Sequence, residues 1–334
     1  MHCNDRYPVL ASQITMKRVD IHFAFVLAAV TMLAILPPVA TAAGAELQKR
    51  TLVVDHRNRS FLLYVPSVVS ENDEKRPLVL VFHGGGGTAR GIAREVGRSL
   101  HTIADREGFI VAYPDAVKKT WDFGAGVVSE ALDVRIDDRR FFAALMDELV
   151  ETQPVDKTRI FATGISRGGQ ASYFVACQFP DRIRAIAPVA MPMPAFMADA
   201  CKAKDIGIAV LNGTDDPLVP YDGGQIKVRR KERGLVMSTD DTIDFWRQRN
   251  DCDATPTDSA VIDEVNDQTR VLRTTWEQCS QAPVLLYRIE GGGHTWPAGR
   301  QYLPPRRIGR VSAEIDGASE IWAFFSKVAV PTGR

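Results

Sequence analysis

A serine flanked by glycines carries the strongest sign of chemistry in the sequence. The segment Gly164-Ile165-Ser166-Arg167-Gly168 follows a short apolar run typical of a strand and precedes a segment with helical periodicity. A strand–turn–helix of this kind holds a serine hydroxyl exposed on a sharp turn, and small residues on both sides let the chain turn there. We therefore predict that Ser166 is a nucleophile, the alternative being an ordinary turn rich in glycine.

His294 is the expected base, because a serine hydroxyl is a poor nucleophile at neutral pH. It lies in the segment 291–297, Gly-Gly-Gly-His-Thr-Trp-Pro, where the glycines would let the ring approach Ser166. The other histidines beyond the N-terminal segment have simpler explanations: a hairpin turn for His56, a helix for His101 and the start of a glycine run for His83.

Asp216 is our choice for the acid that would orient His294 and stabilise its protonated form. It lies in the segment 212–220, directly after an expected strand, and gives the chain order Ser, Asp, His. Asp215 is a close rival, and the alternative is that this Asp-Asp-Pro turn only ends the strand.

Two backbone amides are expected to stabilise the oxyanion that forms during acyl transfer. The amide of Arg167, the residue after the nucleophile, would supply one. The glycine run 84–87 would supply the other, through Gly85 or, as a second choice, Gly84. No Gly-Lys-Ser/Thr follows this run, which argues against a nucleotide-binding loop. We expect the chemistry to need no metal and no cofactor.

These residues need a scaffold that brings them together, and the sequence predicts an α/β fold. Short apolar runs alternate with segments of helical periodicity, which is typical of a mostly parallel sheet covered by helices. The expected strands are 51–54, 60–65, 78–82, 109–113, 160–163, 186–189, 206–211, 271–275 and 284–289. The expected helices are 93–106, one capped by Asp137, 167–179, 242–250 and one containing 321–325.

The composition is that of an ordinary globular protein. The 334 residues include 41 Lys or Arg and 41 Asp or Glu, with 45% hydrophobic and 25% charged residues. These values exclude a collagen, a coiled coil and a largely disordered chain. The balanced charge and the lack of a basic arm argue against a nucleic-acid partner.

The N-terminal segment has the pattern of a secretory signal. Its apolar run 23–36 follows two basic residues, is too short for a membrane span, and is followed by small residues that fit cleavage after Ala42. Met16 is an alternative start. We expect residues 1–42 to be a signal peptide and residues 43–334 a single catalytic domain, secreted or periplasmic, without a stable membrane span.

Export would place four cysteines in an oxidising compartment, where an even number suits two disulfides. We favour the pairs Cys177–Cys201 and Cys252–Cys279, because each neighbouring pair encloses a similarly short span. Two other pairings and four free thiols are the alternatives. None of the spacings resembles a zinc site.

Taken in order, these segments resemble the polyhydroxybutyrate depolymerase-like esterases, which share an α/β-hydrolase fold with feruloyl and acetylxylan esterases. The resemblance covers almost the whole mature chain: His83 with its glycine run, Trp121, 133–142, the turn at Ser166, 187–190, 213–221, 291–297 and 321–325. It implies an α/β-hydrolase fold and assigns nucleophile, acid and base to Ser166, Asp216 and His294. Because the family's acid precedes a proline, it favours Asp216 over Asp215.

By the same resemblance, Trp121 and Trp296 match aromatic positions near the family's cleft and are candidates for substrate binding, although a tryptophan at such a place as often simply packs. Two positions depart from the family. Asn212 stands where relatives often have histidine, and Arg139 replaces a small apolar residue, a change expected at the pocket wall.

The sequence therefore predicts a secreted serine carboxylic ester hydrolase that acts through an acyl-enzyme. Its partner would be an ester substrate, a small molecule, an oligomer or a polymer-attached group: a hydroxyalkanoate, a feruloyl or an acetyl ester. The alternatives are a serine peptidase or amidase on the same fold and a noncatalytic binding protein.

Two basic clusters add a hypothesis about the substrate. One comprises Lys227, Arg229, Arg230, Lys231 and Arg233, and the other Arg300, Arg306, Arg307 and Arg310. A solvated surface is the simpler explanation. If the clusters border the cleft, they would favour esters that carry an acid, such as uronates or hydroxyacid oligomers.

Overall fold

The computed structural model describes four ranges of the chain: 46–70, 74–124, 136–228 and 231–328. They belong to one compact unit, Ala42–Arg334. The expected signal peptide, residues 1–42, lies outside the described residues, as do Arg229 and Arg230 of the first basic cluster.

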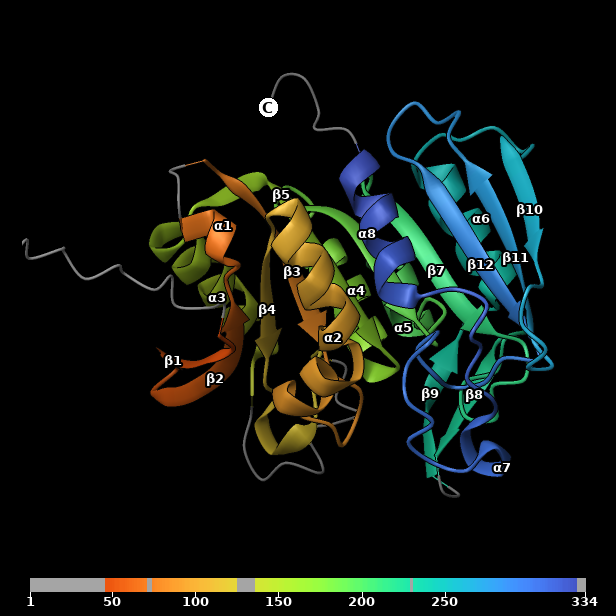
Figure 1. The fold of residues 1–334 in the computed structure, drawn as a ribbon, viewed down its shortest axis with the longest axis horizontal. Helices are drawn as coiled ribbons and strands as arrows, with labels where there is room; N and C mark the ends of the chain where they lie inside the picture. Colours follow the sequence, from red (N-terminus) through yellow and green to blue (C-terminus); the bar gives the residue numbers. More distant parts are fainter. Residues whose placement is uncertain (1–45, 71–73, 125–135, 229–230, 329–334) are drawn as a thin grey trace, which may run out of the picture. The chain divides into compact units, whose positions relative to one another are not determined.

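Ten strands in these ranges form one sheet in the order β1-β2-β4-β3-β5-β6-β7-β12-β11-β10 (Figure 1). The pairs from β4 through β12 in this order are parallel, and the two pairs at each edge are antiparallel. The strands are β1 (Gln48–Val54), β2 (Arg57–Tyr64), β3 (Arg76–Phe82), β4 (Ile110–Pro114), β5 (Val155–Ile165), β6 (Ile183–Val189), β7 (Gly207–Gly213), β10 (Asp258–Ile262), β11 (Arg270–Trp276) and β12 (Val284–Glu290). Strands β6 and β7 are buried along their whole length, as expected where helices cover both faces.

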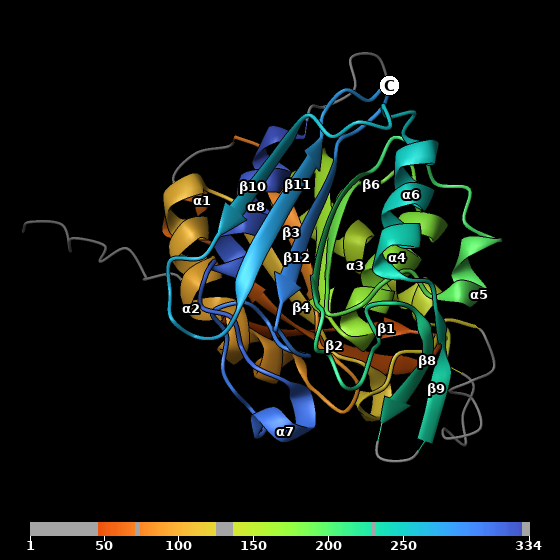
Figure 2. The same cartoon turned by 90° about the vertical axis from the view of Figure 1, so that its right-hand side faces the viewer.

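The longer helices lie on both faces of the sheet (Figure 2). One face carries α2 (Ala89–Glu107) and α8 (Gly317–Lys327), and the other α3 (Asp138–Thr152), α4 (Arg167–Gln178) and α6 (Thr239–Arg249). The short helices are α1 (Ser67–Ser70), η1 (Val117–Lys119), α5 (Ala195–Ala198) and α7 (Pro305–Ile308). Asp137 caps α3 by accepting a hydrogen bond from the Arg140 amide, as predicted. Within the described ranges, no helix is both long and apolar enough to cross a membrane.

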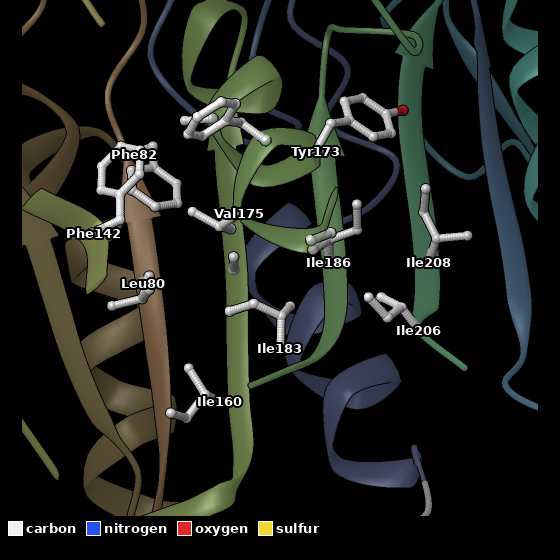
Figure 3. Packing of buried hydrophobic residues seen from close by; sticks show 14 of the residues in the cluster. Leu80, Phe82, Phe142, Ile160, Tyr173, Val175, Ile183, Ile186, Ile206 and Ile208 are labelled. Carbon is white, nitrogen blue, oxygen red and sulfur yellow. The ribbon is translucent and has the colours of Figure 1, made fainter. Parts of the chain in front are cut away.

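Alternating side chains of the strands divide the core into two layers. Leu80 and Phe82 of β3 face α3 and α4, where Phe82 packs against Phe142 with ring centroids 5.1 Å apart (Figure 3). Val79 and Val81 point the other way, into the cluster under α2 and α8. The two layers hold the central strands rigidly, so their carboxyl ends form a fixed platform.

The loops that follow these carboxyl ends carry additional elements. In Figure 1, the arrowheads of β3, β4 and β12 point toward the end of the molecule where α7 and a separate hairpin lie. The hairpin consists of β8 (Gly224–Val228) and β9 (Lys231–Val236). In an open α/β sheet this edge is where ligands bind.

The predicted mostly parallel sheet flanked by helices is confirmed, and every predicted strand and helix overlaps an observed one. The sequence missed β8, β9 and β10. The hairpin contains the charged run 227–233, and β10 is a short, largely exposed edge strand. Neither has the apolar alternation by which a half-buried strand is recognised.

Both disulfides join the cysteines that the spacing favours. Cys177 at the end of α4 is bonded to Cys201, and Cys252 is bonded to Cys279. The first bridge ties α4 to the segment after α5, and the second ties the chain after α6 to the loop between β11 and β12. Each bridge therefore closes a short loop of the chain on the face of the sheet that carries α3, α4 and α6.

Candidate active site

Ser166 occupies the sharp turn between β5 and α4. Its φ and ψ of 58° and −121° are rare for a residue with a side chain and mark a strained backbone. The turn is held on both sides: the Ser166 amide donates to the Val189 carbonyl, 2.8 Å away, and the Ser166 carbonyl accepts from the Gln170 amide. This is the conformation that the sequence pattern predicts for an exposed nucleophile.

Glycines allow this turn to lie directly against the end of β3. A Cβ atom at Gly168 would be 2.1 Å from the Phe82 carbonyl oxygen, and one at Gly164 would be 2.5 Å from the same oxygen. No side chain fits in that space. The two glycines of the motif are therefore required by backbone packing as well as by the turn.

His294 and Asp216 form a buried pair at the neighbouring strand ends. The His294 Nδ1 atom lies 2.6 Å from the Asp216 Oδ2 atom, and the side chains are only 5% and 2% exposed. The other carboxylate oxygen of Asp216 accepts hydrogen bonds from the amides of Leu218 and Val219. With Nδ1 directed at the carboxylate, Nε2 of His294 is the ring nitrogen left to exchange a proton.

The structure distinguishes Asp215 from Asp216, the two candidates for the acid in the sequence analysis. Asp215 is exposed, and its carboxylate accepts a hydrogen bond from the Thr214 hydroxyl. Asp216 alone of the two contacts His294. The geometry therefore favours Asp216 as the residue that orients the ring.

A cavity of about 850 Å³ brings Ser166 and His294 to one surface. Gly84, Gly85 and Arg167 line it as well. Much of the remaining wall is apolar: Ile92, Ile165, Met191, Leu218, Val219, Ile226, Val228, Leu303 and Ile308. Among the described residues, no group of three or more His, Cys, Asp or Glu side chains could hold a metal ion.

The predicted oxyanion donors lie on this cavity wall. The Gly86 amide donates to the Lys119 carbonyl and the Gly87 amide to the Gly84 carbonyl, so these two are already engaged. The amides of Gly84 and Gly85 are the candidates that remain. The Arg167 amide is the first of α4 and has no acceptor within the helix.

His83 fixes the shape of the glycine run, a role that the sequence did not reveal. The Ala116 amide donates to Nε2 of His83, so the proton of the neutral ring is on Nδ1, which donates to the Gly84 carbonyl 2.8 Å away. Burial lowers the pKa of His83 and keeps it neutral. The only hint in the sequence was its position next to the glycines.

The two tryptophans proposed as substrate contacts are instead in the core. Trp121 is fully buried, donates to the His83 carbonyl and packs against Phe82. Trp296 is 2% exposed and lies against Gly317. Neither lines the cavity, so both support the site from behind. Residues of the β8–β9 hairpin and of the segment 302–308 take their place at the wall.

The two departures from the family pattern have different outcomes. Asn212 is buried and links two loops, since its Oδ1 accepts from the Met191 amide and its Nδ2 donates to the Thr239 hydroxyl. Arg139 is exposed on α3, where it donates to Gln178, and it does not line the cavity. The expected effect of Arg139 on the pocket wall is therefore not seen.

Replacing Gly168 by alanine should destabilise the protein. The new methyl group would overlap the carbonyl of Phe82, so the turn or β3 would have to move, which we expect to cost about 3 kcal/mol. Gly85→Ala is the matched control, because the nearest atom to its Cβ would be 3.7 Å away. Urea unfolding monitored by tryptophan fluorescence measures both, and equal stability of the two variants would contradict the packing argument.

Known proteins resemble this chain in sequence and in fold, although no protein-family model matches it. NocK of Nocardia uniformis subsp. tsuyamanensis, a protein named as an esterase, is 29% identical over 83% of this chain and 81% of its own length. Feruloyl esterase B of Piromyces equi is 28% identical over 68% of this chain, but the match spans only 41% of that enzyme. The solved acetyl xylan esterase from Aspergillus awamori superposes with a TM-score of 0.53 at 15% identity, over 84% of this chain and 99% of that enzyme.

These comparisons confirm the predicted fold and the resemblance to feruloyl and acetylxylan esterases, while activity on polyhydroxybutyrate stays a prediction. The chain has an α/β-hydrolase fold and is similar in sequence to proteins named as esterases and feruloyl esterases.

Proposed function

We propose that this protein hydrolyses carboxylic esters through an acyl-enzyme formed on Ser166. One observation carries the proposal: Ser166, on its strained turn, lines the same cavity as His294, whose ring is directed by the buried Asp216. Similarity to proteins named as esterases supports the same reaction class.

Each group has a defined step in this reaction. The Ser166 hydroxyl oxygen attacks the ester carbonyl carbon while Nε2 of His294 accepts the hydroxyl proton. The amide of Arg167 and that of Gly85 or Gly84 donate to the oxyanion. As the intermediate collapses, His294 returns the proton to the departing alcohol, and a water molecule activated by His294 then releases the acid and regenerates Ser166.

The cavity favours an acyl or alcohol group with an apolar part. Its largely apolar wall would take a feruloyl group, and its volume of about 850 Å³ also leaves room for a hydroxyalkanoate oligomer. Acetyl esters would leave most of this wall uncovered. Hydrolysis rates of methyl ferulate, acetylated xylan and hydroxybutyrate oligomers would rank these classes.

Replacement of Ser166 by alanine should lower kcat/KM for a simple aryl ester by at least about a thousandfold, because the attacking oxygen is lost. A fluorophosphonate should transfer its phosphonyl group to Ser166 with loss of HF, so the peptide that contains Ser166 should gain the mass of the reagent minus HF in the native protein, and no peptide of the variant should. Ser326→Ala, at an exposed site on α8, is the control and should retain full activity. An S166A variant with most of its activity would refute the proposal, and cleavage of amides but not esters would support a peptidase instead.

Asp216→Asn should lower kcat by about 10⁴-fold, because an amide in this place favours the wrong tautomer of His294. Asp215→Asn removes the same charge one residue away, at an exposed site, and should change kcat less than about threefold. Steady-state kinetics on the same ester compare the two. A larger loss of kcat in D215N than in D216N would identify Asp215 as the acid.

We also propose that the protein is exported after cleavage following Ala42. The two disulfides fit an oxidising compartment. Intact-mass analysis of protein recovered from the periplasm or medium should then give a chain that starts at Ala43. Protein retained in the cytoplasm with its N-terminal segment attached would contradict export.

A further inference from the structure

Two arginines line the cavity together with Ser166 and His294. One is Arg167, directly after the proposed nucleophile, and the other is Arg233 in the middle of β9. The arginines of the second basic cluster do not line the cavity. Of the seven basic residues of the two clusters that the structure describes, only Arg233 lines the cavity, and Arg167 lines it as well.

Arg167 is held in a fixed orientation. Its Nε and Nη2 atoms donate to the Trp121 carbonyl at 3.2 and 2.8 Å, and Nη1 donates to Gln170 at 3.3 Å. The guanidinium also lies over the Phe123 ring, 5.1 Å from its centroid. Because a guanidinium has five N–H groups, these bonds leave donors for a ligand, and little orientational freedom would be lost on binding.

Arg233 reaches the cavity from the hairpin. Ile226 and Val228 of the paired strand also line the cavity, so this face of the hairpin is the one turned toward Ser166. Arg233 is exposed and has no carboxylate within ion-pair distance among the residues that the structure describes. Its charge is therefore open to a ligand.

The acidic residues around the pair are Asp122, Asp138 and Glu95. Burial and then the charge of Arg233 lower the pKa of Arg167 to about 10, while Asp122 and Asp138 raise it. Asp138 is already paired with Arg59, at 2.6 Å. The acid on the cavity wall is Glu95 of α2, which accepts from the Arg300 amide and whose pKa burial raises.

We propose that the cavity binds esters that carry a carboxylate close to the scissile bond, and that Arg233 and Arg167 hold this carboxylate between them. The inference rests on the proposed ester hydrolysis. A carboxylate would relieve the repulsion between the two guanidiniums and accept their remaining donors. Because Arg167 is adjacent to the nucleophile, the acid and the ester must be separated by a short linker, as in half-esters of dicarboxylic acids or in esters of hydroxyacids.

A matched pair of esters tests this inference. The native enzyme should hydrolyse monoethyl adipate with a kcat/KM at least about tenfold above that for ethyl hexanoate, followed by proton release in a pH-stat. Added salt should reduce the preference, because Arg233 is exposed. Arg233→Gln should bring the ratio close to one, and Arg233→Lys should keep part of it.

Lys227→Gln is the control for the loss of one positive charge. Lys227 is on the same hairpin and exposed, but it alternates with Ile226 and Val228 and so points away from the cavity. This variant should keep the native ratio. If R233Q lowered kcat/KM for both esters equally, so that the ratio of the two values stayed unchanged, Arg233 would have a structural role and the inference would be overturned.

The failures of the two proposals are distinguishable. If the native protein hydrolyses both esters at the same kcat/KM, ester hydrolysis stands and the carboxylate site is refuted. If it hydrolyses neither of these esters nor a simple aryl ester, the proposed function itself fails.

Discussion

The close approach of two backbones is the constraint on which this site depends. The turn at Ser166 lies so near the end of β3 that neither Gly164 nor Gly168 has room for a side chain. The same end of β3 leads into His83 and the glycine run. One contact therefore sets the distance between the proposed nucleophile and the proposed oxyanion donors, so both depend on how β3 packs against β5.

The proposed catalytic residues and one wall of the cavity come from different parts of the fold, yet hydrogen bonds connect them. Ser166, Asp216 and His294 follow strands of the rigid central sheet, whereas the β8–β9 hairpin supplies one wall. The Lys227 amide of β8 donates to the Leu218 carbonyl, and the Leu218 amide in turn donates to Asp216. The hairpin that lines the cavity is thus connected to the loop that holds Asp216, the proposed acid.

The sequence predicted well what depends on local patterns. Buried strands, the Asp137 cap and the glycines of the turn at Ser166 are encoded by neighbouring residues, so the sheet and the position of Ser166 could be predicted. The sequence also narrowed the acid to two adjacent aspartates, because both follow the same strand. Which of the two contacts His294 depends on side-chain direction in a loop, which the structure shows.

Features that depend on distant contacts were predicted less well. Trp121 and Trp296 have the residue type of a binding surface, but the glycines and aromatic residues packed around them place them in the core. Ile226 and Val228 of the cavity wall lie at the start of the charged run 227–233, a segment that gave no sign of a strand. Only the tertiary fold turns one face of this hairpin toward Ser166.

The hydrogen bonds of His83 have a consequence for proton movement in the cavity. Two imidazoles border the same space, and one of them has both nitrogens occupied by the main chain, at Gly84 and Ala116. The His83 ring can neither accept nor donate a further proton without breaking one of these two hydrogen bonds to the main chain. In the proposed reaction, His294 is therefore the histidine of the cavity wall that remains able to transfer protons, while His83 holds the glycine run in place.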